Sequence, residues 1–183
     1  MTWLDDFLQQ WRIRVVLPEL PPKPRVLDIG TRDGTLFRRA GASGLGIDPE
    51  LIEAAPLPGV TLVKGMFPDG LPSLPAGSFD AATALAVVEH VPDGELASWA
   101  DALARLMNPG GVLVITVPNP TVDKILHVLM RLRLVAGMEA HQHHGFEPGD
   151  LDKIFTGPSW RCKKRRTFQL GLNNLFVYER MPD

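Results

Sequence analysis

A short segment near the start of the chain constrains its fold more than any other. Residues 25–30 (Arg-Val-Leu-Asp-Ile-Gly) form a mostly apolar run that leads through a glycine-containing turn into a helical pattern at 34–41. A second apolar run at 44–48 follows and ends in an acid. Strands that alternate with helices in this way form right-handed βαβ units, whose parallel strands end side by side. The sequence therefore predicts an open α/β fold with a ligand site at these strand ends.

Two acids and two glycines mark that edge of the predicted sheet. Asp28 lies at the tip of the first strand, and Asp48 ends the second strand. Gly30 and Gly34 allow a sharp turn and a close approach of a ligand, because they carry no Cβ. A carboxylate at the second strand end can accept hydrogen bonds from both hydroxyls of a ribose. The pattern indicates a nucleoside site; the alternative is that both acids only cap loops or helices.

The glycine spacing distinguishes two kinds of nucleoside ligand. A dinucleotide site favours Gly-x-Gly-x-x-Gly, with a helix N-terminus open to a pyrophosphate. Here the spacing is Gly30-x-x-x-Gly34, and Asp33 lies inside the turn. Its negative charge and that of Asp28 would repel a pyrophosphate but suit a ligand with an ammonium group, such as S-adenosylmethionine. A nicotinamide oxidoreductase is therefore disfavoured.

Four landmarks along the chain occur in the order of a known family. They are Val26–Gly30, Gly46–Asp48, Phe79–Asp80 with Val88–Asp93, and Leu106–Ile115. With them the chain resembles the class I S-adenosylmethionine-dependent methyltransferases over nearly its whole length. The resemblance implies a Rossmann-like three-layer α/β sandwich. Its mostly parallel seven-stranded sheet would have the order 3-2-1-4-5-7-6, with an antiparallel last strand.

The resemblance also implies the cofactor contacts, at the carboxyl ends of the strands. The methionine part is assigned to Asp28, Gly30, Thr31, Arg32 and Gly34. The ribose is assigned to Asp48, one adenine face to Met66 or Phe67, and the wall beside the sulfonium to Leu85 and Ala86.

Two features depart from the family pattern. Arg32 stands where a middle glycine is usual, so it either strains the turn or reaches the cofactor carboxylate with its guanidinium. An acid that would bind the adenine amine is absent after the third strand. Both departures support an alternative function, that of a non-catalytic cofactor-binding or partner protein with the same fold.

Hydrophobic periodicity and turn residues predict the remaining elements. Strands are expected at 25–30, 44–48, 60–63, 79–85, 111–117, 162–169 and 173–180, and helices at 3–11, 34–41, 50–54, 94–107, 125–135 and 149–156. The link between the third and fourth strands is short and rich in proline, which favours a connection without a crossover helix.

Composition bounds the class of protein. The 183 residues predict a single domain over 1–183, with an N-terminal helix and proline-rich linker at 1–24 and a substrate-side insertion at 119–149. The chain has 19 basic and 21 acidic residues, so no net charge attracts nucleic acid. One cysteine, no apolar stretch of about 18 residues and an N-terminus interrupted by Asp5 and Asp6 predict a cytoplasmic protein.

Histidines are the candidate catalytic bases. His90 follows the fourth strand, and His144 ends a cluster that begins at His141. A neutral imidazole is available near pH 7 to accept a proton. The alternatives are solvated or loop-bonding histidines and, less favoured, a metal site, because the spacing matches no standard zinc pattern. We predict no metal, and His90 and His144 as the catalytic residues.

Two further segments bear on partners. The apolar, arginine-bearing stretch at 121–138 predicts a cover over the sheet or, alternatively, a lid or a weak membrane-surface contact. The basic run at 161–166 is more typical of a solvated sheet edge than of a phosphate or nucleic-acid site. The closing stretch at 168–178 resembles family members found with polysaccharide and glycolipid enzymes. We therefore predict methyl transfer to a small-molecule or glycan-type acceptor, favoured at oxygen.

Overall fold

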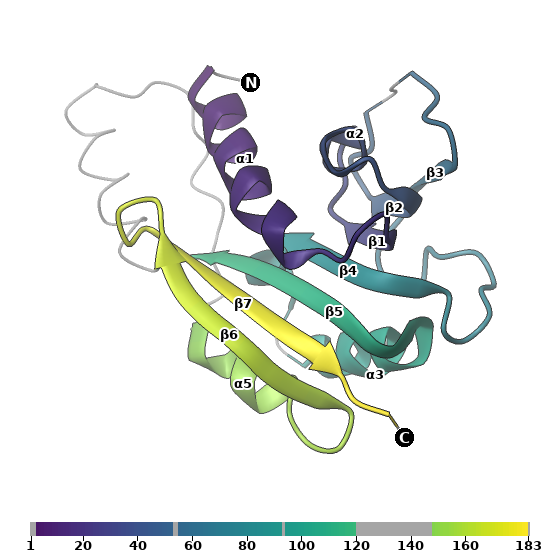
Figure 1. Ribbon diagram of the computed structural model, residues 1–183, viewed down its shortest axis with the longest axis vertical. Helices are drawn as coiled ribbons and strands as arrows, with labels where there is room; N and C mark the ends of the chain where they lie inside the picture. Colours follow the sequence, from purple (N-terminus) through teal and green to yellow (C-terminus); the bar gives the residue numbers. More distant parts are fainter. Residues whose placement is uncertain (1–2, 53–54, 93, 120–147, 183) are drawn as a thin grey trace.

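The central feature of the protein is a seven-stranded sheet. The computed structural model describes residues 3–52, 55–92, 94–119 and 148–182. The strands are β1 (Arg25–Ile29), β2 (Ser43–Asp48), β3 (Val60–Lys64), β4 (Phe79–Leu85), β5 (Met107–Pro118), β6 (Trp160–Phe168) and β7 (Asn173–Arg180). They lie in the order β3-β2-β1-β4-β5-β7-β6 (Figure 1). β1 to β5 pair in parallel, whereas β7 runs antiparallel to β5 and β6. The predicted sheet order and the antiparallel last strand are confirmed.

Helices cover both faces of the sheet and complete a three-layer sandwich (Figure 1). One face carries α1 (Trp3–Val16) and α2 (Thr35–Ala40), whose buried residues join one hydrophobic cluster. The opposite face carries α3 (Leu96–Leu106) and α5 (Leu151–Ile154), which join the larger cluster. Short 3-10 turns lie at η1 (Leu17–Glu19), η2 (Val88–His90) and η3 (Pro148–Asp150).

Alternation along the central strands explains how both faces are filled. In β1 the side chains of Leu27 and Ile29 belong to the α3 cluster, while that of Val26 belongs to the α2 cluster. Successive strand side chains point to opposite faces, so a central parallel strand is apolar on both sides. Asp28, on the same face as Val26, is the polar exception, and it lies at the end of the strand. The buried charge of β1 therefore lies near the carboxyl edge, whereas Arg25 at the amino end is exposed.

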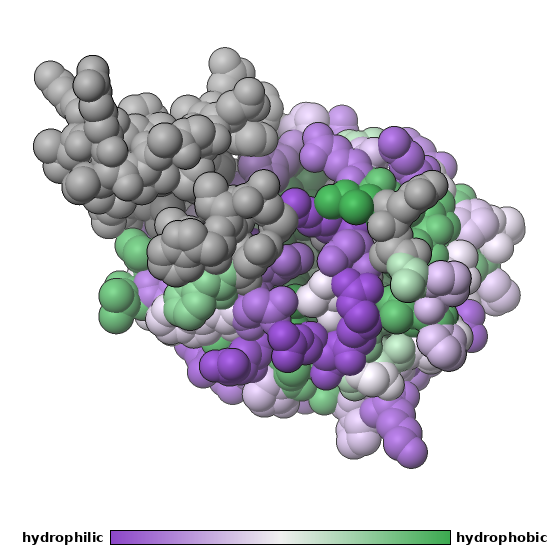
Figure 2. All heavy atoms as spheres, turned by 90° about the horizontal axis from the view of Figure 1, so that it is seen from above, coloured by the Kyte–Doolittle hydropathy of each residue, from purple (hydrophilic) through white to green (hydrophobic). Residues whose placement is uncertain are grey.

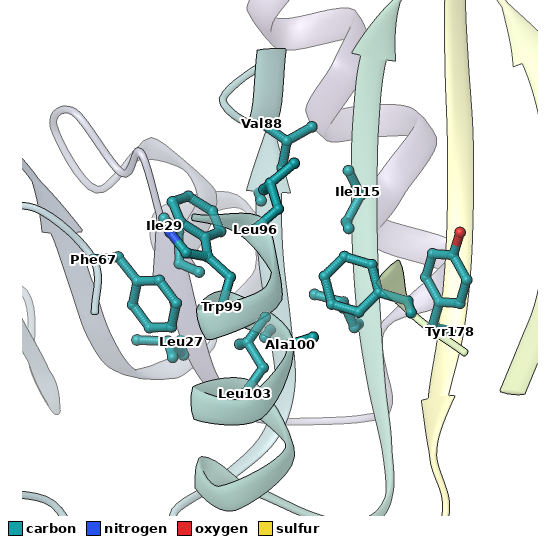
Figure 3. Packing of buried hydrophobic residues seen from close by; sticks show 14 of the residues in the cluster. Leu27, Ile29, Phe67, Val88, Leu96, Trp99, Ala100, Leu103, Ile115 and Tyr178 are labelled. Carbon is teal, nitrogen blue, oxygen red and sulfur yellow. The ribbon is translucent and has the colours of Figure 1, made fainter. Parts of the chain in front are cut away.

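The α3 layer contains a residue that the sequence associated with the cofactor. Phe67 is 5% exposed and packs edge-on against Trp99 of α3, with ring centroids 4.9 Å apart (Figure 3). Residues 65–78 form turns and no helix, in agreement with their proline content. The link between β3 and β4 therefore has no crossover helix, and its Phe67 ring packs directly on α3.

Several predicted boundaries differ from the observed ones, and two of the differences have a clear cause. Residues 50–52 are not helical, because their backbone is tied into a turn: Glu50 N–H donates to Asp48 and Ile52 N–H donates to the Arg32 carbonyl. The expected helix at 50–54 is therefore wrong over these described residues. β5 begins at Met107 rather than near 111, since Met107 already pairs with Phe79.

Tyr178 links the sheet to α5 and gives a test of that contact. Its hydroxyl donates to Asp152 Oδ1 at 2.9 Å, while the remainder of the side chain is buried in β7. We expect Tyr178→Phe to lower the free energy of unfolding by about 1–2 kcal/mol, because a hydrogen bond to a charged acceptor is lost. Urea unfolding measures this as a lower midpoint at an unchanged slope. An unchanged midpoint would show that the hydroxyl contributes nothing to stability.

Candidate cofactor-binding site

A tight turn joins the end of β1 to the end of β2. Gly30 and Gly34 have φ angles of 77° and 75°, in the left-handed region that favours glycine. Gly30 N–H donates to the carbonyl of Ile47 at 2.8 Å, which holds the turn against β2. A Cβ on Gly30 would lie 2.3 Å from Cγ2 of Val87, after β4. The turn therefore lies close to the segments that follow β2 and β4, and it requires glycine at position 30.

Both carboxylate oxygens of Asp48 accept hydrogen bonds from backbone N–H groups at this turn. The side chain is buried; Oδ2 accepts from Arg32 N–H at 2.8 Å, and Oδ1 accepts from Glu50 N–H at 2.7 Å. Asp48 thus caps the loop, as one interpretation of the sequence proposed. A carboxylate has about four lone-pair positions, so two backbone donors leave capacity for two ribose hydroxyls. The capping role and a ribose-binding role are compatible.

Asp28 is a buried acid beside the same turn. It is 4% exposed, and Thr83 of β4 donates to its Oδ1 at 2.6 Å across the strand pair. Burial raises the pKa of Asp28 to about 6; the hydroxyls of Thr83 and Thr31 oppose this rise, and the charges of Asp48 and Asp33 add to it. No basic side chain among the described residues pairs with Asp28. A buried carboxylate in this state favours a cationic ligand group.

Arg32 occupies the position where the family usually has glycine, and its backbone is left-handed, with φ 55°. Its N–H and its carbonyl are both hydrogen-bonded, to Asp48 and to Ile52 N–H, at 2.8 and 2.9 Å. The side chain is half-buried. A left-handed non-glycine residue costs about 1–2 kcal/mol, so the turn carries strain that a glycine would avoid.

The segments after β3 and β4 border the same edge. Gly65 N–H donates to the Asp48 carbonyl at 3.1 Å, which brings the start of the 65–78 loop beside Asp48. Met66 is 56% exposed, in contrast to the buried Phe67. After β4, Ala86 has φ 58° and its N–H donates to the Thr116 carbonyl of β5 at 2.9 Å. Leu85 and Ala86 therefore lie at the carboxyl end of β4, next to β5.

Of the two candidate bases, His90 lies among the described residues and His144 does not. His90 is exposed at the end of η2, three residues after the Val87 that approaches Gly30. Its backbone N–H donates to the Val87 carbonyl at 3.0 Å. His144 and the stretch at 121–138 fall outside the described residues. Within those residues no group of three metal-ligating side chains occurs.

Thr83 and Val87 were missed by the sequence interpretation. Thr83 is fully buried and touches Asp28, and Val87 lies where a Cβ on Gly30 would be. Thr83 had a detectable signal, because it is a polar residue within the apolar part of its strand. Val87 had none, since its role depends on how the loop after β4 returns to the turn.

The basic run on β6 is engaged in ion pairs at the sheet edge. Arg161 and Lys163 pair with Glu179, and Arg165 pairs with Asp152. Lys164 and Arg166 approach Glu19 at 2.8 and 3.9 Å. Each cation of the run therefore has an acidic neighbour, which favours the solvated-edge interpretation over an anion site.

The surface seen from above Figure 1 is mixed in polarity. Figure 2 shows hydrophilic residues as a band across the middle of that face, with hydrophobic residues on either side. None of the helices in the described part of the chain is long and apolar enough to cross a membrane.

Comparisons with known proteins agree with this geometry. A family model described as "Methyltransferase domain" matches residues 2–157. A ubiquinone biosynthesis O-methyltransferase of Xanthomonas campestris pv. campestris is 30% identical over 170 residues, covering 86% of this chain and 68% of that protein. One from Xanthomonas oryzae pv. oryzae is 37% identical over 107 residues, 53% of this chain and 44% of that protein. The chain spans about half the length of several of these relatives.

Solved structures share the fold at low sequence identity. The 1,6-didemethyltoxoflavin-N1-methyltransferase of Burkholderia thailandensis, solved with S-adenosylhomocysteine, has a TM-score of 0.68 at 15% identity, covering 98% of this chain and 81% of that chain. A SAM-dependent methyltransferase of Methanosarcina mazei has a TM-score of 0.64 at 18% identity, covering 92% and 98%. The chain belongs to the methyltransferase-domain family, and the predicted class I family and fold are confirmed.

Proposed function

We propose that this chain is an S-adenosylmethionine-dependent methyltransferase domain that methylates a hydroxyl oxygen of a small-molecule acceptor. The observation that carries the proposal is the convergence of Asp28, Asp48 and the Gly30 turn at one sheet edge. A nucleoside with an ammonium group fits this set. Among the described residues Asp28 is buried without a cationic partner, and Asp48 retains free lone pairs. We propose one domain over residues 1–183.

Each residue has a distinct part in the proposed site. Asp48 accepts from the ribose hydroxyls, and Asp28 faces the ammonium group beside Thr31 and the Gly30–Gly34 turn. Met66 covers the adenine, because its side chain is exposed, whereas the Phe67 side chain is buried against Trp99. Leu85 and Ala86 line the sulfonium side. Together these residues bind and orient the cofactor, and the oriented methyl group meets the acceptor beyond β4.

For methyl transfer the protein has to align the methyl group with the acceptor oxygen and to accept one proton. S-adenosylmethionine supplies an activated methyl group, and its carbon–sulfur bond electrons stay on sulfur as a neutral thioether. The acceptor oxygen forms the new bond to that carbon and loses its proton. We assign this proton to the imidazole of His90, with His144 as a second candidate base.

The acceptor class rests on the relatives. Proteins named ubiquinone biosynthesis O-methyltransferases match this chain, which supports oxygen as the methylated atom. A glycan-type acceptor remains the second candidate, supported by the sequence resemblance of residues 168–178. Methylation assays with hydroxylated aromatic compounds and with sugar nucleotides separate the two, by S-adenosylhomocysteine formed above the acceptor-free rate.

Calorimetric titration with S-adenosylhomocysteine tests the proposed cofactor. We expect saturable binding to one site, and no response to a nicotinamide dinucleotide. An absence of S-adenosylhomocysteine binding at high micromolar ligand would favour the alternative of a partner protein that kept the fold. Binding without methyl transfer to either acceptor class would favour a non-catalytic cofactor-binding protein.

Replacement of His90 tests its role as a base. We expect His90→Gln to slow single-turnover methylation about tenfold, less than the roughly 10²–10⁴-fold typical of acid–base catalysis, because the leaving thioether needs no proton. The affinity for S-adenosylhomocysteine should stay unchanged. Equal single-turnover rates for His90→Gln, for a His90→Gln/His144→Gln double variant and for the wild type would remove both histidines from the mechanism.

A further inference from the structure

The Arg32 side chain is the feature of the site that neither the family pattern nor the fold requires. The turn needs a left-handed residue at position 32, and glycine would supply it without strain. The backbone there is fixed from both sides, by Asp48 Oδ2 on the N–H and by Ile52 N–H on the carbonyl. Strained positions persist mainly where the surroundings hold them, and they concentrate at functional sites. The retained arginine therefore calls for a role of its side chain.

The acidic residues around the turn indicate that the site requires a cation. Three acids, Asp28, Asp33 and Asp48, lie in or beside it. Asp33 is neutralised by Arg38, whose guanidinium lies 2.9 Å from its Oδ2 and also donates to its backbone carbonyl. The amino-acid part of S-adenosylmethionine carries an ammonium group and a carboxylate. The acids suit the ammonium group, but they would repel the carboxylate unless a cation lies between them.

Arg32 is the candidate for this cation. Among the described residues its guanidinium takes part in no ion pair, and only its backbone forms hydrogen bonds. Arg38 is already occupied by Asp33. Lys64 is the last residue of β3 and pairs with Asp48 of β2. It therefore lies on the adenine side of the proposed site. Among these three described basic residues, Arg32 is therefore the one that lies in the glycine turn itself and whose side chain forms no ion pair.

We propose that Arg32 binds the cofactor carboxylate through its guanidinium and so makes the site selective for ligands that carry the whole amino-acid group. The inference rests on the proposed function. A guanidinium presents its donors as a planar fork that matches the two oxygens of a carboxylate. The side chain thus takes over a contact for which a glycine turn offers only backbone N–H groups.

Two ligands and four proteins test the proposal. S-adenosylhomocysteine contains the amino-acid group, and 5′-methylthioadenosine has the same nucleoside thioether without it. Both are titrated calorimetrically into the wild type, Arg32→Met, Arg32→Gly and Arg39→Met. Arg32→Met removes the charge and keeps a non-glycine residue in the turn, whereas Arg32→Gly also removes the strain. Arg39→Met removes a charge from the exposed face of α2 and serves as the matched control.

We expect both Arg32 variants to bind S-adenosylhomocysteine roughly tenfold more weakly than the wild type. Their affinity for 5′-methylthioadenosine should be unchanged, and the control should match the wild type for both ligands. Arg32→Gly should also unfold at a higher temperature than Arg32→Met.

An equal loss of affinity for both ligands would show that Arg32 acts through the shape of the turn, and unchanged affinities would show that it does not touch the ligand; either result overturns the proposal. A wild type that binds neither ligand would instead overturn the proposed function. The two failures are therefore distinguishable.

Discussion

Replacing Asp48 by alanine should weaken S-adenosylhomocysteine binding by roughly 10- to 150-fold, the loss expected when hydrogen bonds to a charged acceptor disappear. Asp48 is the proposed acceptor for the ribose hydroxyls, and no other described carboxylate ends β2. The same change removes the partner of two backbone N–H groups, of Arg32 and Glu50. We therefore also expect the free energy of unfolding to fall by about 1–3 kcal/mol.

Asp80 provides the matched control for this prediction. It lies at the amino end of β4, where its oxygens accept from Arg25 N–H and from the Asn108 amide, each at 3.0 Å. Asp80→Ala thus removes a carboxylate that also holds two donors, but at the opposite edge of the sheet. We expect it to destabilise the fold and to leave S-adenosylhomocysteine affinity unchanged. Equal affinity losses in the two variants would mean that Asp48 acts only through stability.

Replacing Asp28 by asparagine should stabilise the unliganded protein and weaken cofactor binding. Burial raises the pKa of Asp28 from its usual value of 3.8 to about 6, so the folded protein holds this proton more tightly than the unfolded chain does. The contribution of Asp28 to stability is then highest below about pH 4, falls as the pH rises to about 6 and levels off above it. Asp28→Asn removes this loss and keeps an acceptor for Thr83. We expect it to be about 1–3 kcal/mol more stable at pH 8, measured by urea unfolding.

The binding of the ligand should respond in the opposite direction. An ammonium group favours the ionised form of Asp28, so wild-type affinity for S-adenosylhomocysteine should fall roughly tenfold as the pH is lowered from 7.5 to 5. Asp28→Asn should show the weaker affinity at both pH values. A wild-type affinity that does not change between these pH values, or a variant that binds as tightly as the wild type, would separate Asp28 from the ligand.

Much of the fold could be predicted because its signals are local. The runs at 25–30 and 44–48 with their glycine turn fix the first βαβ unit, and the order of the other strands came from the family resemblance. Local sequence patterns do not indicate which distant element a loop packs against. Phe67 lies in an exposed-looking proline-rich link, yet it fills the space beside Trp99. Residues 50–52 are held in a turn by Asp48 and Arg32 rather than by helical hydrogen bonds.

The candidate site was predictable in its acids and glycines and less so in its surroundings. The sequence indicated Asp28 and Asp48 because each lies at a strand end. Their partners depend on contacts between strands that are distant in sequence: Thr83 reaches Asp28 across 55 positions, and Val87 closes on Gly30. The left-handed backbone of Arg32 was foreseeable from the family glycine. That its side chain forms no ion pair with any residue that the structure describes could be seen only in the structure.

A crystal structure of the protein with S-adenosylhomocysteine tests the central claim most directly, that one nucleoside site is formed where β1, β2 and β4 end. We predict both ribose hydroxyls within hydrogen-bonding distance of Asp48, the ammonium group beside Asp28 and the adenine against Met66. A nucleoside bound elsewhere on the protein, or one in this site with its ribose turned away from Asp48, would contradict the account.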